Sequence, residues 1–300
     1  MSLLHDLREV VTLGGLTPWE LARRVWEQLF EDDVFAYSAQ LAYYFLFSLF
    51  PFFIFLAALL AYIPIPDLIQ QAMTLLSELV PATVADTLKE NVLDLVTRPR
   101  GGLLSFSILL ALWTASSAIE AIANSLNRAY GVKERRPWWK VRLTAMLLTV
   151  GLAVLVLASM ALLIFGPELG GFIAAKVGLG TAFQMLWDLI RWPLTVFLMI
   201  FAAAIIYYFA PDVEQEWRWI TPGSVFAVLS WIAISLSFSW YVDNFGNYNL
   251  MYGSIGAVIV LLTWMYFSGL SILVGGEINA EIEHAAEGGK RKGQKKMPEK

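Results

Sequence analysis

Six long apolar runs constrain the fold of this chain more than any other feature. Each is close to the roughly 20 residues that an α-helix needs to cross about 30 Å of hydrocarbon. They cover residues 36–63, 102–125, 143–165, 192–210, 220–242 and 253–276. The 300 residues are 58% hydrophobic and only 15% charged, whereas a soluble domain holds about 25% charged residues. The sequence therefore predicts an all-α, polytopic membrane protein with six transmembrane helices.

Two terminal regions flank the predicted membrane domain, which covers residues 32–283. In the cytoplasmic N-terminal segment, residues 1–31, Thr17-Pro18-Trp19-Glu20 has the signature of a helix start closed by a capping box. This amphipathic helix either lies in the membrane interface or packs onto the helix bundle. Residues 284–300 are polar and rich in lysine, which predicts a disordered, basic cytoplasmic tail.

One further segment is expected to lie outside the bilayer. Residues 67–100 follow the first span and contain Asp86, Lys89 and Glu90, so they are too charged to cross the membrane. Their apolar residues recur at helical spacing, which predicts short amphipathic helices against the membrane or the mouth of the bundle.

The basic residues predict the orientation in the membrane. An even number of spans places both termini on one side, and that side also carries residues 128–142, the most basic interior loop. The loops on the opposite side contain few lysines and arginines. By the positive-inside rule, both termini are cytoplasmic in a multi-pass protein of the cell (inner) membrane. Residues 1–30 lack the apolar core of a signal peptide, so we expect the first span to act as an uncleaved insertion signal.

Glu120 is the one carboxylate within the apolar core of a predicted span. Such a residue is costly in a membrane and often marks a pathway. Helical spacing and similar depth in other spans add polar neighbours, which together form a candidate polar pocket open to the cytoplasm. Its members are Gln40, Ser116, Glu120, Asn124, Asn127, Tyr207, Glu277 and Asn279. The alternative is structural: Glu120 is protonated, bonded to a Ser or Asn of a neighbouring helix, or hydrated, and Glu120→Leu would then favour insertion.

Two polar segments outside the spans are weaker candidates for binding. The loop before the sixth span is a candidate extracytoplasmic site, although turn formation accounts for most of its composition. Its polar residues are Asp243, Asn244, Asn247 and Asn249. The basic tail would attract anionic lipid, while anchoring under the positive-inside rule explains the same charges.

The chemistry-bearing residues do not form an enzyme's site. The chain has no Cys and two His, and both histidines (His5 and His284) lie near the termini. No HExxH, Walker A or GxGxxG motif occurs, and Tyr252-Gly253-Ser254-Ile255-Gly256 is not a nucleophile elbow. We therefore expect no catalytic residue, no cofactor, no metal and no nucleic-acid partner. The lipid bilayer is the predicted partner, and the sequence does not specify an oligomeric state.

Three separated groups of motifs resemble the YihY/BrkB family, which is also labelled virulence factor BrkB or ribonuclease BN-like. They are Asp32-Asp33, Ala42-Tyr43-Tyr44 and Leu49-Phe50-Pro51; Leu112-Trp113-Thr114-Ala115-Ser116-Ser117 and Leu126-Asn127-Arg128; and Tyr248-Asn249, Tyr252-Gly253-Ser254, Trp264 and Gly276-Glu277-Ile278-Asn279-Ala280. The resemblance implies a bacterial-type inner-membrane protein with six helices and no firmly assigned activity.

With the polar face around Glu120, this resemblance favours transport or translocation of a small solute or lipid-like molecule. The alternative is a non-catalytic membrane scaffold or envelope-maintenance factor. Ribonuclease activity is not expected.

Overall fold

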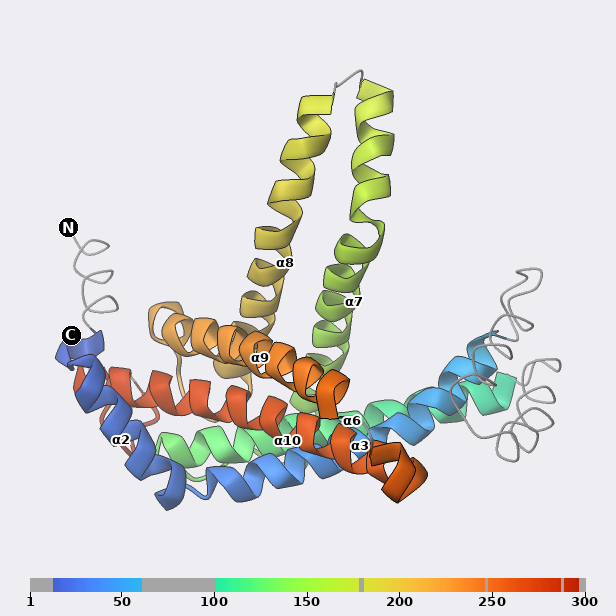
Figure 1. The fold of residues 1–300 in the computed structure, drawn as a ribbon. Helices are drawn as coiled ribbons and strands as arrows, with labels where there is room; N and C mark the ends of the chain where they lie inside the picture. Colours follow the sequence, from blue (N-terminus) through green and yellow to red (C-terminus); the bar gives the residue numbers. More distant parts are fainter. Residues whose placement is uncertain (1–12, 61–100, 178–180, 246–247, 287–288, 297–300) are drawn as a thin grey trace. The chain divides into compact units, whose positions relative to one another are not determined.

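The computed structural model describes residues 13–60, 101–177, 181–245, 248–286 and 289–296, and every regular element in these ranges is a helix (Figure 1). The elements are η1 (Leu13–Gly15), α2 (Pro18–Glu31), α3 (Val34–Leu60), α6 (Gly101–Ala129), α7 (Trp138–Val177), α8 (Thr181–Phe209), α9 (Trp217–Phe245) and α10 (Tyr248–Ala285). The chain divides into two compact units, residues 1–43 with 116–300 and residues 44–115.

Six of these helices are long and apolar enough to cross a membrane, which confirms the predicted fold class. The candidate spans are Val34–Phe55, Gly101–Ala129, Trp138–Glu168, Met185–Phe209, Thr221–Val242 and Gly256–Ala285. They follow the predicted order. The amphipathic segment expected at residues 67–100 lies outside the described residues.

Helix α2 begins at the predicted start signal. Thr17 Oγ1 accepts a hydrogen bond from Glu20 N at 3.2 Å, and Glu20 Oε2 accepts one from Thr17 N at 2.9 Å. This capping box satisfies two backbone donors that a helix start leaves open. The face with Val25 and Leu29 is buried, and α2 packs on α10. The structure thus shows the helix packed onto the bundle, one of the two alternatives.

Helices α7 and α8 form an antiparallel hairpin that is longer than predicted (Figure 1). We expected the third span to end at Gly166, but α7 continues to Val177, and α8 begins at Thr181. Trp187 of α8 holds the extension, because its Nε1 donates to Gly166 O at 2.6 Å. Its indole also fills the space beside Gly170, where a Cβ would lie 2.3 Å from the ring. Small residues on α7 therefore allow the aromatic ring to join the helices beyond the apolar run.

Helices α9 and α10 cross at a backbone contact that only glycine allows. A Cβ on Gly223 would lie 1.9 Å from Gly275 O, and a Cβ on Gly275 would lie 2.4 Å from the hydroxyl oxygen of Tyr207 on α8. Gly223 N donates to Asn279 Oδ1 at 2.7 Å, and Tyr207 donates to Ile272 O at 2.6 Å. Small residues thus let the backbones of α9 and α10 approach closely at this glycine crossing.

The expectation of a disordered tail is wrong for the part of it that the structure describes. Lys290 is fully buried, and Gly293 N donates to Tyr130 O at 2.7 Å. Charge made this segment look solvated, but carboxylates and carbonyls of other segments supply partners that the sequence alone does not place nearby.

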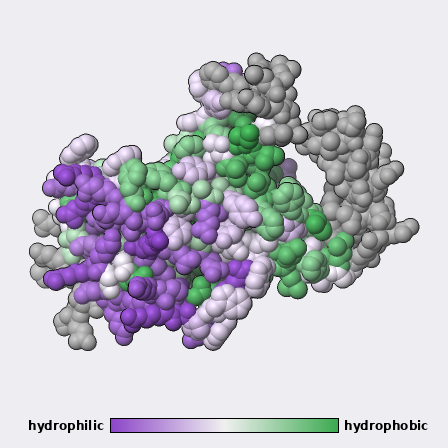
Figure 2. All heavy atoms as spheres, turned by 90° about the horizontal axis from the view of Figure 1, so that it is seen from below, coloured by the Kyte–Doolittle hydropathy of each residue, from purple (hydrophilic) through white to green (hydrophobic). Residues whose placement is uncertain are grey.

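Hydrophilic residues gather at one end of the larger unit, which we call the terminal end. It is the end that carries α2 and residues 289–296, and it is purple in Figure 2. Green, hydrophobic side chains cover much of the remaining described surface in that view. This division matches a membrane domain with a polar cap.

Candidate functional site

Glu120 is paired with an arginine of the neighbouring helix. Its Oε2 lies 3.0 Å from Nη1 of Arg142 on α7, and the same nitrogen donates to Ser117 Oγ at 3.2 Å. The Arg142 side chain is 8% exposed and that of Glu120 is 30% exposed. Arg142 was assigned to the basic loop from the sequence. Its position immediately before the third predicted span, residues 143–165, was the signal that could have identified it as a partner.

Three other members of the candidate pocket are buried on α8 and α10, and two of them contact the glycine crossing. Tyr207 and Asn279 make the hydrogen bonds described above, and Glu277 is 1% exposed. Within the described part of the chain, Glu277 Oε2 has no hydrogen-bond partner. A buried carboxylate oxygen without a donor is uncommon and is a candidate for a functional role.

The remaining members lie in different surroundings. Ser116 is fully buried, whereas Gln40 and Asn124 are exposed. The side chain of Asn127, at the end of α6, is buried in a polar network instead. The eight residues thus fall into separate environments, and the best candidates for a common site are Tyr207, Glu277 and Asn279.

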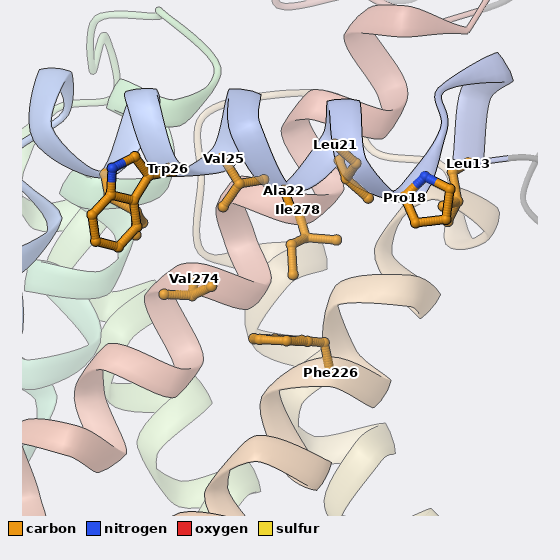
Figure 3. Close-up of a pocket in the computed structure, with 10 residues that line it drawn as sticks. Leu13, Pro18, Leu21, Ala22, Val25, Trp26, Phe226, Val274 and Ile278 are labelled. Carbon is orange, nitrogen blue, oxygen red and sulfur yellow. The ribbon is translucent and has the colours of Figure 1, made fainter.

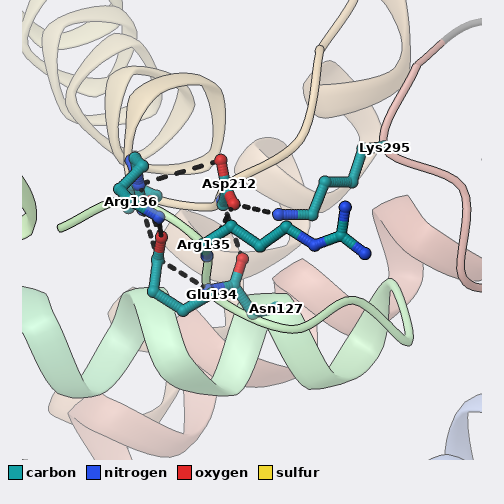
Figure 4. A network of polar contacts seen from close by, with 7 residues as sticks. Asn127, Glu134, Arg135, Arg136, Asp212 and Lys295 are labelled. Carbon is teal, nitrogen blue, oxygen red and sulfur yellow. Dashed lines mark hydrogen bonds and ion pairs between the residues drawn. The ribbon is translucent and has the colours of Figure 1, made fainter.

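The Asn127 network ties three connections together at the terminal end (Figure 4). Asn127 Oδ1 accepts from Asp212 N at 2.7 Å, and its Nδ2 donates to Glu134 Oε2 at 3.1 Å. Arg136 Nη2 donates to Glu134 Oε2 at 2.7 Å, and Lys295 of the tail pairs with Asp212. Burial raises the pKa of Glu134, but the hydrogen bonds from Arg136 outweigh this effect, so the pKa lies below its usual range. Such satisfied, charge-assisted contacts indicate a structural role.

The candidate extracytoplasmic loop is mostly helical. Asp243 and Asn244 lie in the last turn of α9, and Asn249 lies in the first turn of α10. Asn244 Nδ2 donates to Trp240 O at 2.8 Å, while Asn247 lies outside the described residues.

An apolar groove lies between α2 and the α9–α10 pair (Figure 3). Its volume is about 360 Å³, and Trp26 of α2, Phe226 of α9, and Val274 and Ile278 of α10 are among its lining residues. The groove is close to the glycine crossing in sequence on both α9 and α10.

A larger crevice opens between the other halves of α9 and α10. It consists of two adjoining cavities of about 560 and 570 Å³, which share lining residues such as Phe238, Tyr241, Gly256 and Val260. Ser235 and Thr263 add hydroxyl groups to its lining. The two helices are thus in backbone contact at the glycine crossing, whereas at the crevice Trp264 Nε1 of α10 donates a hydrogen bond to Ser235 Oγ of α9 at 3.2 Å. Sequence reasoning missed this crevice, because the separation of two helices depends on their crossing angle.

Among the described residues, no group of three or more His, Asp and Glu side chains is arranged to hold a metal ion. His284 lies 4.0 Å from Glu281 Oε1 and packs edge-on against Tyr130.

Comparisons with known proteins place the chain in a family. The chain is 41% identical over 243 residues to the ribonuclease-like protein YfkH of Bacillus subtilis (strain 168), an alignment covering 81% of this chain and 88% of that protein. It is 27% identical to a UPF0761 membrane protein of Verminephrobacter eiseniae (strain EF01-2), over 94% of this chain and 67% of that protein. It is 26% identical to one of Vibrio campbellii (strain ATCC BAA-1116), over 91% and 85%. No solved structure matches the chain. The virulence factor BrkB family matches residues 25–300, and the chain therefore belongs to this family of integral membrane proteins.

Proposed function

We propose that this protein translocates a lipid-like, amphiphilic molecule and that the α9–α10 crevice is part of its path. The observation that carries the proposal is the crevice itself, which lies between two candidate spans and is lined by apolar side chains with a few hydroxyls. A cavity of this composition suits an acyl chain better than a small polar solute. The crevice lies along α9 and α10 between the glycine crossing and the two-residue connection of these helices, so its apolar lining belongs to the two candidate spans.

A polar site at the terminal end fits the same function. Glu277 and Asn279 are buried on α10, and Val274 and Ile278 of the same helix line the apolar groove under α2. An amphiphile needs both an apolar path and a place for its polar group. We propose that Tyr207, Glu277 and Asn279 form that polar part, while Glu120 serves the α6–α7 contact.

A lipid-translocation assay on the purified protein tests the proposal. The protein is reconstituted into vesicles with a fluorescent phospholipid in both leaflets, and a membrane-impermeant reductant reports the movement of lipid to the outer leaflet. We expect loss of fluorescence beyond the half that protein-free vesicles show. Val260→Trp fills the crevice and should slow it, whereas the matched control Val258→Trp, on an exposed position of the same helix, should not. Equal rates with and without protein would contradict the proposal and favour the scaffold.

We propose that the termini face the cytoplasm of a bacterial inner membrane. The chain has no Cys, so single cysteines report topology without background. A cysteine at Lys176 should react with an impermeant thiol reagent in intact cells, and one at Lys133 should not. The reverse pattern would invert the topology.

We propose that the protein is not an enzyme, although one relative is named ribonuclease-like. The two histidines are His5 and His284, and the described residues offer no carboxylate cluster that suits a two-metal nuclease. Highly purified protein should leave RNA intact with or without divalent metal. Cleavage that one carboxylate substitution abolishes would show the opposite.

A further inference from the structure

Lys290, five residues beyond α10, sits in a complete ammonium cage. Its side chain is fully buried, and its Nζ lies 2.5 Å from Glu283 Oε1 of α10 and 2.5 Å from Glu214 O of the α8–α9 connection. The same nitrogen lies 5.5 Å from the centre of the Tyr130 ring. A carboxylate, a carbonyl and an aromatic face are the groups that bind a desolvated ammonium.

Two further tail lysines contact carboxylates of other segments. Lys292 Nζ lies 3.6 Å from Asp32 Oδ2, at the junction between α2 and α3, and 2.6 Å from Gln28 Oε1. Lys295 pairs with Asp212 in the α8–α9 connection. The three lysines thus connect α10, the α2–α3 junction and the α8–α9 connection through one short segment.

The tail backbone extends this connection to α6. Gly293 N donates to Tyr130 O just past the end of α6, and Glu214 N donates to Lys295 O at 2.8 Å. A Cβ on Gly289 would lie 1.8 Å from Glu283 O, so the chain can turn this closely against α10 only with glycine at this position. The backbone of the segment therefore makes specific, close contacts with the surface on which it lies.

Polar contacts alone hold this segment in place. Residues 289–296 read Gly-Lys-Arg-Lys-Gly-Gln-Lys-Lys and contain no apolar side chain beyond the lysine and arginine stems. Hydrophobic burial, the main stabilising force of a folded core, contributes little here. The contacts of Lys292 and Lys295 are partly exposed, and such contacts are exchanged for water or other ions more readily than a packed core is opened.

We propose that residues 289–296 form a displaceable, autoinhibitory latch that holds the terminal ends of the helices together in the closed state. The latch joins α10 to the connection between α8 and α9, the two helices that meet α10 at the glycine crossing. Releasing it frees these elements to separate. The effect of the latch on lipid movement rests on the proposed function. The release of Lys290 from its cage does not depend on that function.

Limited trypsin digestion of the full chain in nanodiscs measures the release. Trypsin cuts after Lys290 only when that side chain leaves the cage, and mass spectrometry identifies the fragment. Glu283→Gln keeps the shape of the cage but removes its charge, and we expect cleavage after Lys290 to rise at least about tenfold. The control Glu214→Gln removes a charge on the same surface without altering the carbonyl that binds Lys290, and it should leave the rate unchanged. Equal rates for Glu283→Gln and wild type would overturn the latch.

A milder variant and the lipid assay complete the test. Lys292→Gln acts on a half-exposed contact, so it keeps the proposal testable where Glu283→Gln fails to fold. In either variant we expect faster tail release and faster lipid translocation than in wild type. Tail release with translocation slower than in wild type would overturn autoinhibition and make the tail a structural brace. If the variants release the tail but neither they nor the wild type translocate lipid, the result would support the latch and count against the proposed function.

Discussion

Two contacts between neighbouring helices differ in the interaction that holds them: one is an ion pair, and the other is close packing of backbones. Glu120 and Arg142 join α6 to α7 by charge at 3.0 Å, with the carboxylate partly exposed. Gly223 and Gly275 join α9 to α10 by direct backbone contact, with no room for a methyl group. The charged contact depends on two side chains that must both be present, whereas the glycine contact depends on the absence of side chains.

The comparison shows which carboxylate is a functional candidate. Glu120 stands out in the sequence, but an arginine neutralises it. Glu277 ends a predicted span and attracts less notice in the sequence, yet it is buried on α10, and its Oε2 has no partner among the described residues. The surroundings of a carboxylate, rather than its isolation in an apolar run, therefore decide how costly and how available its charge is.

The largest effect is expected from breaking the charged contact. Glu120→Leu leaves Arg142, whose side chain is 8% exposed, without its carboxylate partner, so we expect the opposite of the gain that the structural alternative predicted for leucine. We expect a loss of about 3 kcal/mol, the lower end for a buried pair, because Glu120 is partly exposed. Thermal denaturation of the detergent-solubilised protein measures it.

The double variant Glu120→Leu/Arg142→Leu is the control for that prediction. It removes both charges, so it should regain much of the loss. A single variant as stable as wild type would show that the ion pair has no role in holding α6 to α7.

The next effect is expected at the glycine crossing. Gly275→Val places a side chain against Tyr207 and the Gly223 carbonyl, so α9 and α10 must separate. Overpacking of this kind costs about 1–3 kcal/mol. Gly151→Val is the matched control, because nothing lies within 4 Å of the added Cβ. Similar melting temperatures for the two variants would contradict the crossing.

A smaller change in stability, but a clear change in activity, is expected at Glu277. Glu277→Met replaces a buried carboxyl by an apolar side chain of similar length, so the melting temperature should stay the same or rise slightly. Lipid translocation should fall if the carboxyl binds the polar group of the substrate. Ile278→Met, one position further on α10, is the control and should keep the activity. Full activity of Glu277→Met would remove Glu277 from the proposed site.

The smallest effect concerns pH and Asp32, which lies just before the first span. Burial raises the pKa of Asp32, and the nearby Lys292 offsets part of that rise. The folded protein therefore keeps this proton to higher pH than the unfolded chain, whose pKa is about 4. Stability should decrease as pH rises through the folded pKa, and Asp32→Asn should remove that decrease. Melting curves of both proteins across this range measure it; parallel curves would contradict the prediction.

Several features of the fold were predictable because they depend on local sequence. The capping box at Thr17 and Glu20 uses residues three apart, and the six spans follow from the length of their apolar runs. The end of α7 was not predictable in this way. Gly166 looked like a helix end, but Trp187 of the next helix supports the extension through a contact that is 21 residues distant in sequence.

The candidate site was only partly predictable. Tyr207, Glu277 and Asn279 were named from their depth, and all three are buried. Gln40 and Asn124 were named by the same reasoning and are exposed. Depth along a helix follows from the sequence, but which side of the helix meets a neighbour does not.

The sequence by itself determined that this is an all-α membrane protein with six spans, because the hydrocarbon thickness and the helical rise fix how many apolar residues a span needs. Only the tertiary structure decided the partners: Arg142 for Glu120, the cage for Lys290, and the crevice between α9 and α10. The physical reason is the sequence distance over which each interaction acts. Apolar length and capping act within one segment, whereas ion pairs, cages and crevices depend on how segments far apart in the chain are brought together.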